Sequence, residues 1–202
     1  DGDRDAFIGS SDGQTRFFRN AGSASAPGFT REAGPLDLVV ANAGSARPTF
    51  ADVDGDGDLD AFIGTYGGPI LQFFRNTGSP TGPSFVSESG ALGIVNAQRF
   101  PSPQFVDLDG DGDPDLVSGA DSTADRLIYR NVGTATSPSF VLEQGSFGLT
   151  SIGQYTRPSF ADLDADGDLD AIAGNLGGDL GYYQNSAPGV QIRQSDARTA
   201  VS

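Results

Sequence analysis

The chain has 202 residues, enough to bury a substantial core, and its hydrophobic and charged fractions of 37% and 19% are those of a globular protein. Its formal net charge of −15 disfavours nucleic acid and anionic membrane surfaces as partners. Cysteine, histidine, methionine and tryptophan are absent, which excludes a disulfide framework, a zinc site, haem ligation and a thiol nucleophile. No transmembrane run or lipidation motif is present, so membrane insertion is not expected.

The first of four similar units, residues 1–46, opens on three aspartates at alternate positions: Asp1, Asp3 and Asp5. An apolar strand is predicted at residues 6–9, and after a polar turn an aromatic strand ends in Arg19 and Asn20. This unit lacks the strand and the two aspartates that precede the acidic loop in the later units. Its aspartates are therefore expected to form a half site for a metal ion, weaker than the complete loops.

The second unit, residues 47–101, begins with a strand that enters a nine-residue loop with a carboxylate at every second position. These carboxylates belong to Asp52, Asp54, Asp56, Asp58 and Asp60. The loop recurs 55 residues later in the third unit, residues 102–156, as Asp107, Asp109, Asp111, Asp113 and Asp115. It recurs again in the fourth unit, residues 157–202, as Asp162, Asp164, Asp166, Asp168 and Asp170. Eighteen of the 27 acidic residues lie in the four loops, so the acidity indicates local metal sites rather than a docking surface for a basic partner.

Converging carboxylates need a cation. Two carboxylates about 4 Å apart repel by roughly 1 kcal/mol in water and roughly 4 kcal/mol at the effective dielectric of a protein surface. A hard divalent ion converts this repulsion into coordination, and an all-oxygen ligand set in a flexible loop favours calcium over magnesium. In the second unit we expect side-chain ligands from Asp52, Asp54, Asp56 and Asp60, with Asp58 acting through its backbone carbonyl. Gly57 is placed where the loop must turn sharply.

A plainer interpretation of one Asp/Gly run is a solvated turn or an acidic disordered segment. Three full copies in the same register, each followed by an apolar strand such as residues 61–64 or 171–174, favour metal binding instead. The expected cofactor is Ca²⁺, in about three full sites and a fourth partial one.

Each unit offers four short strands separated by turn signals, and no stretch has a helical hydrophobic period. The prediction is an all-β chain, folded as one β-propeller domain of four-stranded blades over residues 1–202, with the first blade incomplete. The aromatic pairs that precede each polar pair are interpreted as core packing. The last unit departs from the pattern, and its tail, residues 188–202, is expected to be linker-like, although a last strand could form near Ile192.

The loop motif, Phe-x-Asp-x-Asp-Gly-Asp-Gly-Asp-x-Asp followed by an apolar strand and Gly, resembles the FG-GAP/VCBS repeats of integrin alpha subunits and of many bacterial secreted proteins. The resemblance covers roughly residues 1–185 and implies calcium held by the matching aspartates between two strands of each propeller blade. Pro114 and Ala165 depart from the motif but remove no ligand. Because propellers of this family often have seven blades, four units could form a small propeller, an arc of a larger one, or an arc that self-assembles into a ring.

The expected function is an extracellular calcium-binding module for adhesion or ligand recognition, located at the cell surface or secreted, with a protein or glycan ligand. One alternative is a lectin-like propeller, with Tyr66, Tyr155, Tyr182 and Tyr183 as candidate stacking faces. A second is a rigid spacer in a larger surface protein. An enzyme is not expected, because the carboxylates repeat identically in every unit and would be consumed by the metal.

Overall fold

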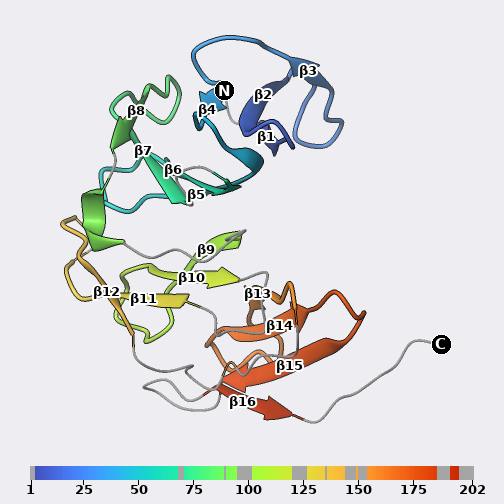
Figure 1. Ribbon diagram of the computed structural model, residues 1–202, viewed down its shortest axis with the longest axis vertical. Coiled ribbons are helices and arrows are strands. Elements are labelled where there is room, and N and C mark those ends of the chain that lie inside the picture. The colour runs from blue at the N-terminus through green and yellow to red at the C-terminus, as the bar shows by residue number, and fades with distance from the viewer. Residues whose placement is uncertain are drawn as a thin grey trace.

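The computed structural model describes residues 3–67, 71–88, 90–94, 102–119, 127–134, 136–143, 149, 154–185 and 192–195. In this part of the chain every regular element is a β-strand, apart from the short 3-10 turn η1 (Ala91–Gly93). The strands form four antiparallel sheets of four strands each, arranged as a four-bladed β-propeller (Figure 1). The predicted all-β propeller of four-stranded blades is confirmed. No helix among the described residues is long and apolar enough to cross a membrane.

The four blades are built from consecutive stretches of the chain, and blade 2 begins at Gly44, three residues before the predicted start of the second unit. Blade 1 contains β1 (Ala6–Gly9), β2 (Gln14–Asn20), β3 (Phe29–Arg31) and β4 (Leu38–Val39). Blade 2 contains β5 (Gly44–Ala51), β6 (Asp60–Tyr66), β7 (Leu71–Asn76) and β8 (Phe85–Glu88). Blade 3 contains β9 (Ser102–Val106), β10 (Asp115–Gly119), β11 (Leu127–Asn131) and β12 (Phe140–Leu142). Blade 4 contains β13 (Arg157–Ala161), β14 (Asp170–Gly174), β15 (Leu180–Asn185) and β16 (Ile192–Ser195).

Blades 2, 3 and 4 are simple meanders in which each strand pairs with the next one along the chain. Blade 1 differs, because β4 does not flank β1 but pairs with the start of β2, where Gln14 lies opposite Val39. The described residues of blade 1 therefore contain no counterpart of β5, as expected for an incomplete first unit. In blade 4, β16 supplies the last strand from within the tail at 188–202, and the rest of that tail lies outside the described residues.

The blades follow one another along a curved row, with blade 1 and blade 4 at its two ends (Figure 1). The strand that enters each acidic loop lies against the preceding blade, since β5 contacts β1 and β2, β9 contacts β5 and β6, and β13 contacts β9 and β10. The acidic loops are therefore attached to the strands that join one blade to another.

Aromatic rings fill the space between blades, as the sequence predicts. The ring of Phe62 on β6 lies 4.6 Å from that of Phe73 on β7 and 4.5 Å from that of Phe105 on β9, measured between centroids. Phe7 on β1 makes the corresponding contacts with Phe17 and Phe50, at 5.0 and 4.6 Å. Tilted ring pairs at these separations contribute about 0.5–1.5 kcal/mol beyond the area that they bury. Blades 1 and 2, and blades 2 and 3, are thus held together by a repeated aromatic contact.

The glycine that ends the second strand of a unit allows the next blade to approach. A Cβ at Gly119 would lie 2.4 Å from the carbonyl oxygen of Thr156, and one at Gly9 would lie 2.0 Å from that of Ala46. Gly174 occupies the same position in blade 4, where a Cβ would meet only the Leu180 side chain at 3.5 Å. Glycine is therefore required sterically at Gly9 and Gly119 but not at Gly174.

Candidate metal centre

Each complete acidic loop connects the first and second strands of its blade, at residues 52–59, 107–114 and 162–169. The loop turns through two residues with left-handed backbone geometry. In blade 2 these are Gly55 and Gly57, with φ of 68° and 92°. The sharp turn predicted at Gly57 is confirmed, and the motif's other glycine is a second such turn. Blade 4 places Ala165 at the first of the two positions, with φ of 63°, a conformation that costs an L-residue about 1–2 kcal/mol.

The first aspartate of each loop closes the turn on itself. The Oδ1 atom of Asp52 accepts the Gly55 amide at 2.7 Å, and its Oδ2 atom accepts the Gly57 amide at 3.0 Å. Asp107 accepts the amides of Gly110 and Gly112 in the same way, at 2.8 and 3.0 Å, and Asp162 repeats the pattern. Since each carboxylate oxygen has two lone-pair sites, these bonds leave acceptor capacity on the same oxygens.

The second aspartate of each loop, at position three, is held by a basic or amide side chain from the third strand of the blade. Asp54 pairs with Arg75, and Asp109 pairs with Arg130. In blade 4 the Gln184 side chain donates to Asp164 at 2.6 Å. In each case the donor contacts the Oδ2 atom of the aspartate. The contact therefore fixes the carboxylate without using its Oδ1 atom.

The third and fourth aspartates of each loop, at positions five and seven, are linked by a hydrogen bond. Asp56 Oδ1 accepts the amide of Asp58 at 2.9 Å, and Asp111 accepts the amide of Asp113 at the same distance. Asp166 and Asp168 repeat this bond at 3.2 Å. The Asp58 side chain is 5% exposed, and burial, followed by the charges of Asp56 and Asp52, raises the pKa of this carboxyl.

The fifth and last aspartate of each loop, at position nine, anchors the loop to the blade through the backbone amide of an asparagine. Asp60, Asp115 and Asp170 are buried, and their Oδ1 atoms accept the amides of Asn76, Asn131 and Asn185 at 2.7, 2.8 and 2.8 Å. Their second oxygens face the loop, where those of Asp115 and Asp170 accept the amides of Leu108 and Leu163 at 3.0 and 3.2 Å. Burial raises the pKa of Asp60 and of Asp115 to about 6, because a charged carboxylate loses its hydration there.

The structure brings three of the five predicted aspartates together in each complete loop, with Asp115 in the group of blade 3 where blades 2 and 4 use their third aspartate. One oxygen from each of three carboxylates lies within 4.8 Å of the others in three groups: Asp52, Asp54 and Asp56; Asp107, Asp109 and Asp115; and Asp162, Asp164 and Asp166. The predicted half site is only partly described. Asp5 accepts the Asn20 backbone amide at 2.7 Å, as the last aspartate of each complete loop accepts the amide of its asparagine. Asp1 lies outside the described residues.

Loop 52–60 fits a cation for a second reason. Within the described chain, three buried oxygens of this loop have no hydrogen-bond partner: Asp54 Oδ1, Asp58 Oδ1 and Asp60 Oδ2. An unpaired buried carboxylate oxygen is costly, and a bound cation is one of the few groups that can satisfy several at once. If an ion binds in this loop, its carboxylate ligands come from Asp52, Asp54, Asp56 and Asp60.

The sequence did not assign a role to the repeated polar pair that ends the aromatic strand. The first member, Arg75 or Arg130, holds the second aspartate of the loop. The second member donates its backbone amide to the last aspartate, while its side-chain oxygen organises the next turn: Asn131 Oδ1 accepts the backbone amides of Gly133 and Ser139 at 3.1 and 3.0 Å. The signal was present, since the pair recurs at a fixed distance from the loop.

Most of the tyrosines considered as carbohydrate-stacking faces are buried, partly buried or hydrogen-bonded within the blade. Tyr183 is fully buried, and the Tyr182 hydroxyl donates to Asp170 Oδ2 at 3.1 Å. Tyr155 is half-buried, which leaves Tyr66 as the exposed member of the four. These tyrosines do not form a repeated stacking surface.

The family model of the FG-GAP-like repeat matches the chain three times, over residues 1–63, 52–118 and 107–173. Each of the second and third matches begins at the first aspartate of one complete loop and extends past the first aspartate of the next. No curated protein matches the chain. With the repeated blades, the acidic loops between first and second strands and three matches that together span most of the sequence, the chain belongs to the FG-GAP-like repeat family.

Proposed function

We propose that the chain is an extracellular calcium-binding repeat module that serves adhesion or ligand recognition, with one ion in each of the three complete loops. The observation that carries the proposal is the set of buried carboxylate oxygens in loop 52–60 that lack a partner. The loop of blade 4 gathers the three equivalent aspartates, and the loop of blade 3 gathers Asp107, Asp109 and Asp115.

The bound ion would have a structural role. Each loop joins the strand that lies against the preceding blade to the strand behind it, so ordering the loop couples two neighbouring blades. Arg75 and Arg130 offset part of the acidic charge by pairing with the second aspartate of each loop, Asp54 and Asp109. The loops of blades 2 and 3 then each retain four more carboxylates, which is the charge that a divalent cation is suited to balance.

An extracellular setting follows from the affinity expected of such loops. Calcium modules outside the cell work at dissociation constants of about 10⁻⁴–10⁻³ M, because the ion is abundant there. The loops of this chain end at their ninth position and lack the bidentate glutamate that an EF-hand carries at its twelfth. They therefore fit this weakly binding class better than the class of tightly binding cytosolic buffers. The family membership shown above supports the same setting.

Calorimetric titration of calcium into chelator-treated protein tests the proposal. We expect about three sites, and one fewer in each of the variants Asp52→Asn, Asp107→Asn and Asp162→Asn. Asp12→Asn is the matched control, because Asp12 lies in the β1–β2 turn and pairs with Arg16, away from the complete loops. Absence of heat and of any calcium-dependent rise in the unfolding temperature would refute the proposal, since saturation a hundredfold above Kd should add about 2.7 kcal/mol per site.

A further inference from the structure

The residue that holds the second aspartate of each complete loop differs in charge between the blades. It precedes the asparagine at the end of the third strand, and it is Arg75 in blade 2, Arg130 in blade 3 and Gln184 in blade 4. All three side chains donate to the Oδ2 atom of the aspartate, so all three fix that carboxylate in the same way. The arginines also bring a positive charge to the loop, and Gln184 brings none.

The arginine of blade 2 belongs to a charged pair that blade 4 replaces at both positions. The Arg75 Nε atom donates to Glu88 on β8 at 3.0 Å. Glu88 is paired in register with Phe73 on β7. The counterpart of Glu88 in blade 4, paired in register with Tyr182 on β15, is Ser195. Blade 4 therefore keeps the hydrogen bond to the loop but carries neither the arginine nor the glutamate.

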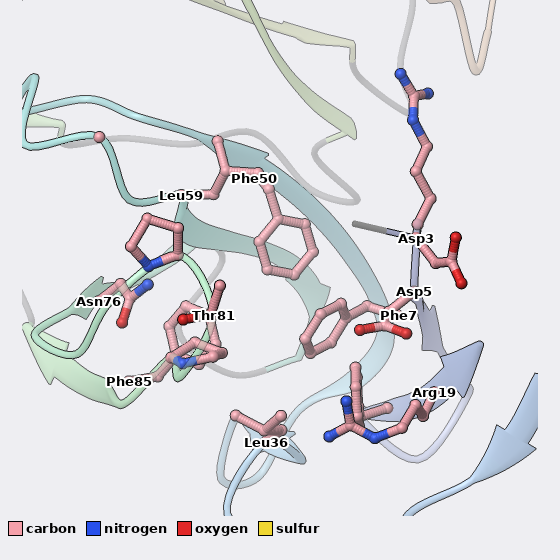
Figure 2. Close-up of a pocket in the computed structure, with 15 residues that line it drawn as sticks. Asp3, Asp5, Phe7, Arg19, Leu36, Phe50, Leu59, Asn76, Thr81 and Phe85 are labelled. Carbon is pink, nitrogen blue, oxygen red and sulfur yellow. The ribbon is translucent and has the colours of Figure 1, made fainter. Parts of the chain in front are cut away.

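Blade 1 repeats the charged pair beside its half site. Arg19 takes the place of Arg75 in the repeat, and its Nε atom donates to Glu32 at 3.0 Å. Figure 2 shows Arg19 and Asp5 at the same edge of the contact between blades 1 and 2. The position is thus arginine in blades 1 to 3, and glutamine is the departure made in blade 4.

The charge of this residue affects how tightly the loop would hold a cation, an argument that rests on the proposed function. Loops 52–60 and 162–170 each contain buried carboxylate oxygens without a hydrogen-bond partner in the described chain, among them Asp54 Oδ1 and Asp168 Oδ1. In blade 2 the guanidinium of Arg75 and a bound ion would share the Asp54 carboxylate. Two cations on one carboxylate lie within the Debye length, about 8 Å at physiological ionic strength, so salt screens their repulsion only in part. Arginine therefore weakens ion binding, whereas glutamine fixes the carboxylate without repelling the ion.

We propose that Arg75, Arg130 and Gln184 set the calcium affinity of their loops through their charge, so that loop 162–170 fills at a lower calcium concentration than loops 52–60 and 107–115. Glu88 offsets part of the Arg75 charge, so the difference between the native loops is smaller than the effect of replacing the arginine alone. Loop 162–170 follows β13, which lies against blade 3, and leads into β14. The contact between blades 3 and 4 would therefore be the first that calcium stabilises.

Calorimetric titration of calcium into proteins with one complete loop tests the proposal. Asp107→Asn with Asp162→Asn leaves loop 52–60, and Asp52→Asn with Asp107→Asn leaves loop 162–170. In the first protein Arg75→Gln should lower Kd at least about tenfold, the effect of about 1.4 kcal/mol, and in the second Gln184→Arg should raise it by the same factor. The two substitutions lie in different blades and act in opposite directions, so a folding defect in one leaves the other to decide.

Two controls separate the charge from the position of the side chain. Arg75→Lys keeps the charge and should leave Kd close to that of the parent, whereas the gain from Arg75→Gln should shrink as ionic strength rises. An equal gain from lysine and glutamine would overturn the proposal. Arg16→Gln is the matched control for net charge, because Arg16 pairs with Asp12 in the β1–β2 turn, away from the complete loops.

Arg193 on β16 is paired in register with Gln184 and is replaced in a separate variant. Arg193→Gln should change the Kd of loop 162–170 less than Gln184→Arg does, because β16 lies one strand farther from the loop than β15, and a larger change would overturn the proposal. Calcium binding with Kd unchanged by Arg75→Gln and Gln184→Arg, or tighter binding by native loop 52–60 than by native loop 162–170, would overturn this inference and leave the proposed function standing. Absence of binding in every one-loop protein would refute both.

Discussion

Replacing Gly119 by alanine should destabilise the contact between blades 3 and 4. The added Cβ would lie 2.4 Å from the Thr156 carbonyl oxygen, well inside normal contact distance, so β10 and β13 must move apart. Overpacking of this kind costs about 1–3 kcal/mol. For a chain of this size each kcal/mol lowers the unfolding temperature by about 2–4 °C, which thermal unfolding followed by circular dichroism can resolve.

The matched control is Gly174→Ala, at the same position of blade 4, where the Cβ would meet only the Leu180 side chain at 3.5 Å. This variant should be neutral or slightly stabilising, because alanine reduces the entropy of the unfolded chain. Gly9→Ala, with a contact of 2.0 Å to Ala46, should behave like Gly119→Ala. Equal stability of the Gly119 and Gly174 variants would refute the close approach between blades.

Three other substitutions or conditions test the loops. Ala165→Gly should raise the free energy of unfolding by about 1 kcal/mol in urea denaturation, because φ of 63° strains alanine and not glycine, and an unchanged midpoint would contradict that geometry. Asn131→Ala should cost about 1–3 kcal/mol in the same assay, since the Gly133 and Ser139 amides lose their acceptor, whereas a neutral effect would mean that water replaces it. In chelator, stability should rise as pH falls from about 6 towards 4, because the folded state with the raised pKa of Asp60 and Asp115 binds protons that the unfolded chain does not. With calcium bound the slope should reverse, because protons then compete with the ion, and identical pH profiles in the two buffers would argue against ion binding at these carboxylates.

Much of the fold could be predicted because the repeat is so regular. The interval from Asp52 to Asp107 and on to Asp162 defines the units, and each unit needs partners on both faces to bury its aromatic residues. The blades and the loop-entering strands follow from that requirement. The role of Gly119 did not follow, because its necessity arises from Thr156 in another blade, and the sequence does not show how closely two blades approach.

The sequence predicts which residue type would bind the ion, but it does not predict as well which residues hold those aspartates in place. The alternating aspartates indicate a cation and set the fourth aspartate apart as a backbone ligand, but the pattern does not show what holds each side chain in place. The structure separates them: Asp107 closes the turn, Asp109 pairs with Arg130, and Asp115 is buried as the anchor of the loop. The roles of Asp109 and Asp115 depend on contacts with residues 21 and 16 positions further along the chain, which become neighbours only when the blade is formed.

Anomalous diffraction from crystals grown with calcium tests the central claim most directly. A peak of calcium strength should lie in each complete loop, next to Asp52, Asp107 and Asp162, and should vanish from the second loop in the Asp107→Asn variant. Three loops with ordered aspartates and no anomalous signal at millimolar calcium would contradict the claim that these carboxylates are assembled to hold an ion.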